Sequence, residues 1–238
     1  MTEPAILPGP RAALRDFALF LRRPQVLVPA GLRSGAAWQR WAWLTALLVG
    51  GLIGVALPLI MLWQWAFALP AAEAFSQFPR AWLIPTVIAI APLIEELMFR
   101  GWQRGSAAGL WLLGCAALAV AALLGLRAPD QALTVAGLFL ALLLAAPLGW
   151  WLLRRRPAPL GWFARGFPWI FYFAAGIFAA VHLGNYPAVS LLALPLVLPQ
   201  LWAGLVLGHM RQKIGLTGAI LAHATSNACT LSLALLSG

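Results

Sequence analysis

Acidic side chains are nearly absent from this sequence. Six Asp and Glu residues stand against 16 Lys and Arg, and charged residues make up only 9% of the chain. Soluble domains carry about 25% charged residues, so this composition argues against a soluble fold. Hydrophobic residues reach 63%, and we therefore expect an integral membrane protein.

Cysteine and basic clusters are also scarce. Cys115 and Cys229 both lie inside apolar runs, where a disulfide framework has no role, so no redox chemistry is expected. The formal net charge of +10 comes from basic residues scattered between apolar runs rather than gathered on one polar face. Nucleic acid is therefore not an expected partner.

Long apolar runs make up most of the chain. They cover about residues 41–68, 81–99, 106–126, 131–153, 167–183, 187–208 and 214–236. Most reach the length of about 20 residues that a spanning helix needs. The sequence predicts an all-α, polytopic membrane helix bundle with about seven transmembrane helices.

The chain divides at the first apolar run. Residues 1–37 are too polar to span, but apolar residues alternate there with arginines, so we expect a cytoplasmic or interfacial segment that lies partly on the lipid surface. Pro24 limits any single helix in this segment. Residues 38–238 form the expected transmembrane domain.

The basic residues predict the orientation. With a cytoplasmic N-terminus, fourteen of them fall on the inside and only Arg80 and Arg127 on the outside. This asymmetry follows the positive-inside bias. We expect a multi-pass protein of a bacterial-type plasma membrane, with its N-terminus in the cytoplasm and its C-terminus outside.

A few polar side chains lie within the predicted spans. A charged group near the bilayer centre costs roughly 2.5–3.5 kcal/mol on insertion scales, so each needs a reason. The residues in question are Glu95, Glu96, Arg100, His182, His223 and Asn227. For one histidine alone, a structural hydrogen bond between helices is the simpler explanation, and we assign His209 to that role. The whole set is better explained as a functional site.

Helical spacing separates the roles of the two glutamates. Glu96 and Arg100 are four residues apart and can pair along one face. Glu95 points about 100° away and has no such partner, which makes it the better general-base candidate. Pro85 and Pro92 in the same run predict a bend, which would either open backbone carbonyls toward a cavity or be an ordinary kink.

The other polar residues repeat this spacing. Phe178 and His182 are four apart, as are His223 and Asn227, so each helix presents one imidazole with a companion. Glu95 and His182 differ in expected depth. They meet only if the second span continues toward Arg104, or if the fifth starts deeper or tilts.

Three motifs in order, Glu-Glu-x-x-x-Arg, Phe-x-x-x-His and His-x-x-x-Asn, resemble the CPBP family. This family contains the type II CAAX prenyl proteases and bacteriocin-processing or immunity proteins, and is also called Abi. The resemblance covers about residues 81–236 and implies an intramembrane endopeptidase with a CAAX prenyl protease type II-like core.

The resemblance also implies a role for each residue. Glu95 would activate water with the support of Glu96 and Arg100. His182 and His223 would orient the water or bind a metal, and Asn227 would donate to the oxyanion, with Phe178 as a supporting residue. The apolar runs at 106–153 depart from the usual pattern, and we interpret them as an inserted helical hairpin.

The residues leave the cofactor and the activity open. Two histidines and Glu95 are also the ligand set of a catalytic zinc site, so a divalent metal such as zinc is the one cofactor that the pattern admits. The chain lacks His-Glu-x-x-His, Gly-x-Ser-x-Gly and a pair of aspartates in the spans, which argues against zincin, rhomboid-like and aspartyl proteases.

Two other functions use the same polar groups. A non-catalytic scaffold or immunity factor would keep the site for binding, and a proton-coupled transporter would use it as a relay. As a protease, the protein would have membrane lipids and a membrane-embedded or lipidated peptide substrate as its partners. The sequence does not determine the oligomeric state.

Overall fold

The computed structural model of the chain describes residues 9–73, 79–156, 158–187 and 190–237. Regular structure in this part of the chain is entirely helical. The α-helices are α1 (Pro10–Arg22), α2 (Gly35–Gly51), α3 (Leu57–Phe67), α4 (Arg80–Pro85), α5 (Ala91–Arg100), α6 (Ala107–Gly125), α7 (Ala132–Leu153), α8 (Gly161–Val181), α9 (Leu198–Lys213) and α10 (Leu216–Ser237). Shorter helical turns are Leu52–Ala56, Thr86–Ile90, Pro129–Gln131, His182–Asn185 and Leu191–Val197.

Seven helical stretches among the described residues are long and apolar enough to cross a membrane, which confirms the predicted fold class. They are Gly35–Phe67, Ala81–Arg100, Ala107–Gly125, Pro129–Leu153, Gly161–Asn185, Leu191–Lys213 and Leu216–Leu236. Their ends differ from the apolar runs by several residues. The first begins at Gly35, because the Ser34 hydroxyl accepts a hydrogen bond from the Ala37 backbone N–H at 3.2 Å and so caps the helix.

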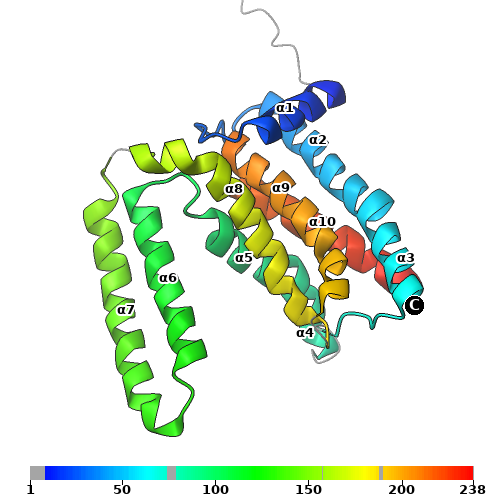
Figure 1. Cartoon of the computed structure of the whole chain (residues 1–238). Coiled ribbons are helices and arrows are strands. Elements are labelled where there is room, and N and C mark those ends of the chain that lie inside the picture. The colour runs from blue at the N-terminus through cyan, green and yellow to red at the C-terminus, as the bar shows by residue number, and fades with distance from the viewer. Residues whose placement is uncertain (1–8, 74–78, 157, 188–189, 238) are drawn as a thin grey trace, which may run out of the picture.

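Helix α1 is amphipathic and lies across one end of the bundle (Figure 1). Its Ala13, Phe17 and Phe20 side chains are buried, and the helix packs against α2 and α9. The helix ends at Arg22, two residues before Pro24. The chain then runs as an extended segment to α2, held where the Leu27 N–H donates to the Gln212 side chain at 3.1 Å.

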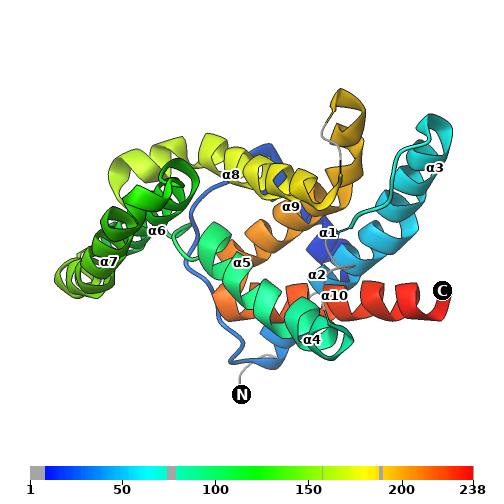
Figure 2. The ribbon, with the colours of Figure 1, turned by 90° about the horizontal axis from the view of Figure 1, so that it is seen from below.

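Helix α9 is the centre of the bundle, and α8, α2 and α10 pack around it (Figure 2). Two glycines on α9 allow α8 to approach closely. A Cβ atom at Gly204 would lie 3.2 Å from Ala175, and one at Gly208 would lie 2.7 Å from the Phe171 ring. Helix α5 packs against α10 on the other side of this core.

The α6–α7 hairpin stands apart from this bundle (Figures 1 and 2). The two helices pack on each other, and the Trp111 indole N–H donates to the Ala145 carbonyl at 3.1 Å. The hairpin joins the bundle at Gly105, which has φ +64°, accepts a hydrogen bond from the Leu160 N–H and lies against the Phe163 ring. This position strongly favours glycine, because a residue with a side chain rarely adopts that φ and the Phe163 ring leaves no room for a Cβ atom. These helices occupy the segment that we interpreted as an insertion.

Candidate active site

The helix that carries the two glutamates contains a π-helical turn. Thr86–Ile90 joins α4 to α5, and Pro92 follows in the first turn of α5. In the i to i+5 pattern of a π turn, the donor for the Val87 carbonyl would be residue 92, and proline has no N–H. The Asn227 amide nitrogen on α10 donates to this carbonyl instead, at 2.9 Å.

Glu96 links the glutamate helix to α10. One oxygen, Oε1, accepts hydrogen bonds from Arg100 Nη1 and from His223 Nδ1, the latter at 2.9 Å. The Glu96 and Arg100 side chains are 0% and 2% exposed, so the predicted pair forms in the interior of the bundle. The Arg100 guanidinium also lies 4.0 Å from the centre of the Phe178 ring on α8.

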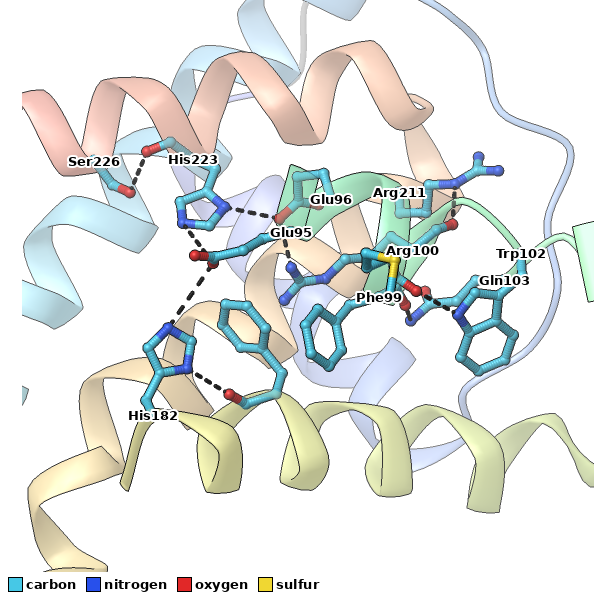
Figure 3. Close-up of polar contacts among 12 residues, drawn as sticks. Glu95, Glu96, Phe99, Arg100, Trp102, Gln103, His182, Arg211, His223 and Ser226 are labelled. Atoms are coloured by element: carbon cyan, nitrogen blue, oxygen red, sulfur yellow. Dashed lines mark hydrogen bonds and ion pairs between the residues drawn. The ribbon is translucent and has the colours of Figure 1, made fainter. Parts of the chain in front are cut away.

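Glu95 lies between the two predicted histidines (Figure 3). Its Oε2 atom is 3.9 Å from His182 Nε2 and 3.8 Å from His223 Nε2, and its side chain is 27% exposed. These distances are too long for direct hydrogen bonds. Each is short enough for one water molecule to bridge Glu95 to that histidine, since a hydrogen-bonded water lies about 2.8 Å from each partner.

The hydrogen bond that each histidine makes on the side away from Glu95 determines which of its ring nitrogens carries the hydrogen. His182 Nδ1 lies 2.7 Å from the Phe178 carbonyl oxygen, and His223 Nδ1 contacts the paired Glu96 carboxylate. Both partners accept hydrogen bonds, so each Nδ1 carries the hydrogen. In the neutral rings both Nε2 lone pairs then point toward Glu95. Protonation would turn either Nε2 into a donor.

The same three groups match a metal site in their tautomers but not in their spacing. The tautomers suit ligation, because metal-binding histidines usually donate their other N–H to a carboxylate or a carbonyl. Two ligand atoms on a tetrahedral zinc lie about 3.4 Å apart, which is shorter than the Glu95–histidine separations given above. Among the described residues no group of three His, Cys, Asp or Glu side chains is arranged to hold an ion. The side chains as they lie do not fit zinc.

Glu95 and His182 were expected at different depths, and the courses of their two helices explain why they meet. The glutamate helix continues to Arg100 and is followed by a turn to Arg104. Helix α8 begins at Gly161 and contains Pro168, and its first turns run sideways before the rest descends toward the site (Figure 1). The Phe99 and Phe178 rings, 5.1 Å apart, hold α5 and α8 together one turn from the two polar residues.

Two polar side chains of α9 that contact the end of α5 were not singled out from the sequence. Arg211 Nε donates to the Arg100 carbonyl at 2.9 Å, and Gln212 Nε2 donates to the Gln103 carbonyl at 3.1 Å. Both carbonyls lie at or just beyond the C-terminal end of α5, so the two bonds tie this end of the helix to α9. Arg211 had been interpreted only as a charge that sets orientation. Its position in the last turn of an apolar helix was the one available signal.

His209 differs from the other two histidines. Its ring is buried between Phe17 and Phe20 of α1, with centroid distances of 5.4 and 4.6 Å. Neither ring nitrogen has a hydrogen-bond partner among the described residues. The hydrogen bond between helices that we expected is therefore absent from the described part of the chain, and the ring packs between aromatic side chains instead.

The fold and site together define a class: a polytopic helical membrane protein with a carboxylate and two imidazoles facing one another between three helices. A comparison with family models then identifies the family. The model of the Rce1-like type II CAAX prenyl endopeptidases matches residues 76–229, more than half of the chain. The chain belongs to this family, which indicates an intramembrane protease of the CAAX type. No curated protein and no solved structure shows a significant match.

Proposed function

We propose that the protein hydrolyses peptide bonds within the membrane by means of a water molecule activated by Glu95. The observation that carries this proposal is the convergence of Glu95 Oε2 with the Nε2 atoms of His182 and His223, at 3.8–3.9 Å, distances that one water molecule can bridge. The Glu95 side chain is 27% exposed, so protein atoms do not fully enclose the carboxylate. A general base in such a position contributes about 10²- to 10⁴-fold to a rate.

The reaction begins when Glu95 removes a proton from the water. The water oxygen attacks the scissile carbonyl carbon, and the carbonyl oxygen becomes an oxyanion. Glu95 then gives the proton to the leaving amine nitrogen, and the carbon–nitrogen bond breaks. The Glu95 carboxylate is restored, so each cycle consumes one water molecule and one peptide bond.

The surrounding groups stabilise this sequence of charges. Glu96 accepts from His223 Nδ1 and so fixes the orientation of the ring, and an Nε2–H on this ring would donate to the oxyanion. Asn227 has two amide hydrogens. One bonds the Val87 carbonyl, and the second would serve as a further donor. Each such donor is worth roughly 3–4 kcal/mol in comparable sites. No step in this scheme uses a metal.

We further propose that the substrate is a membrane-embedded or lipidated peptide. The site lies on helices long enough to span a bilayer, so the scissile bond has to reach it from within or beside the membrane. The basic end of the bundle is assigned to the cytoplasmic side of a bacterial-type plasma membrane.

The test compares peptide termini in membranes that contain the native protein or its Glu95→Gln form. We expect new termini with the native protein and at least a hundredfold less cleavage with Glu95→Gln, which should remain folded because no direct hydrogen bond is lost. His182→Gln and His223→Gln should also lose cleavage.

The third histidine provides the matched control. His209→Leu removes a buried ring whose two nitrogens bond no described residue, and this variant should retain cleavage. Full cleavage by Glu95→Gln would eliminate the hydrolase proposal and favour a binding role for the site.

A further inference from the structure

The exposed side of α1 carries two adjoining surface hollows that the proposed protease site does not use. One, of about 490 Å³, is lined by Arg11, Ala12, Arg15, Asp16 and Leu19. The other, of about 370 Å³, is lined by Asp16, Leu19, Phe20, Arg23, Gln25, Leu27 and Lys213. They share Asp16 and Leu19, so they adjoin along the helix, and we call the two hollows together the recess of α1.

The charge of this recess is strongly positive. Arg11 and Arg15 are four residues apart and exposed on the same face of α1. Arg23 and Lys213 line its other end. The only acidic residue among the lining residues is Asp16, and it is already paired with Lys213 at 3.2 Å. The recess therefore offers free guanidinium groups to an anion, and arginine binds phosphate groups particularly well.

The recess also has an apolar component. Leu19 is 49% exposed, and the partly buried Leu27 lines the same hollow. Leu14, on the neighbouring face of α1, is 54% exposed. A soluble anion would make no favourable contact with these apolar side chains, whereas the acyl chains of a lipid would cover them.

The place of the recess in the fold agrees with this chemistry. Helix α1 lies across the end of the bundle where α9 ends at Lys213 and α2 begins (Figure 1). Because the helices that could span a membrane end here, we expect α1 to lie at the depth of lipid headgroups.

We propose that the Arg11–Lys213 recess on α1 is a binding site for the headgroup of an anionic phospholipid. The phosphate would lie between Arg11 and Arg15, with an acyl chain along Leu19. This assignment is separate from the protease proposal, since none of the lining residues contacts Glu95, His182 or His223.

The test uses the full chain in detergent micelles and counts bound lipids by native mass spectrometry. Phosphatidylglycerol and phosphatidylcholine with identical acyl chains are added separately. We expect phosphatidylglycerol to bind at least tenfold more tightly. Arg11→Gln combined with Arg15→Gln should weaken that binding about 30-fold, the factor expected for two interfacial basic residues.

Arg155→Gln combined with Arg156→Gln is the matched control. It removes the same charge from exposed positions after α7, outside the recess, and should change binding less than threefold. Asp16→Asn should strengthen binding, because it removes the one acid, and this gain cannot arise from misfolding.

Three results would overturn the proposal. Equal affinity for the two lipids would exclude a headgroup site. Equal losses in the two double variants would indicate bulk charge rather than this recess. Displacement of phosphatidylglycerol by an equal concentration of inorganic phosphate would indicate a site for a soluble anion.

Discussion

The buried ion pair behind the site predicts that two adjacent glutamates respond differently to the same substitution. Glu96→Gln would leave the Arg100 guanidinium, only 2% exposed, without an ionised partner in direct contact. Breaking a buried pair in this way costs about 3–5 kcal/mol. Glu95→Gln alters a carboxyl group that is 27% exposed and makes no direct hydrogen bond, so its cost should stay below about 1 kcal/mol.

Denaturant unfolding in detergent micelles, followed by the fluorescence of the 13 tryptophans, measures both costs. Glu96→Gln should lower the ratio of folded to unfolded protein by about two to four orders of magnitude. Arg100→Met in the Glu96→Gln background should recover more than half of the loss, because it removes the unpaired charge. The recovery separates a charge effect from a loss of packing.

Two results would refute this reasoning. A Glu96→Gln protein within about 0.5 kcal/mol of the native one would mean that Arg100 is not held by Glu96 in the interior. A further loss of stability on adding Arg100→Met would mean that the arginine has another, stronger partner. Either outcome would also weaken the role of Glu96 in orienting His223.

Three further predictions concern the supports of the site and its chemistry. Arg211→Met removes the buried donor to the Arg100 carbonyl and should lower the free energy of unfolding by about 1.5–3 kcal/mol, whereas an unchanged denaturation midpoint would exclude this tie. Gly105→Ala should lower the free energy of unfolding by about 1–3 kcal/mol, because its Cβ would lie 2.2 Å from the Phe163 ring. Gly114→Ala, whose Cβ would have no atom within 4 Å, should leave the free energy of unfolding unchanged or raise it. Cleavage should continue in the presence of a metal chelator. If the chelator abolished cleavage and added zinc restored it, the metal-free scheme would be wrong.

Much of the candidate site was accessible from periodicity. The spacing of four residues placed Glu96 beside Arg100 and His182 beside Phe178, and both contacts are present, the latter as rings 4.9 Å apart. These contacts lie within one helix or within its last turn. The geometry of an α-helix alone determines which residues share a face.

Contacts between helices were not accessible in the same way. Asn227 was predicted as an oxyanion donor, but nothing in its spacing from His223 indicated that it would hold the Val87 carbonyl across 140 residues. The π turn that frees this carbonyl follows from Pro92 only once the local register is known. The proline itself was visible, while its partner was not.

The sequence by itself determined that this protein crosses a membrane about seven times and carries a rare set of polar groups in its spans. Composition and length decide this, because the bilayer accepts only long apolar helices and makes every exception costly. Tertiary structure decided that Glu96 orients His223, that both Nε2 atoms face Glu95, and that Arg211 ties down the glutamate helix. These contacts depend on which helix faces pack together, and short-range periodicity carries no information about that choice.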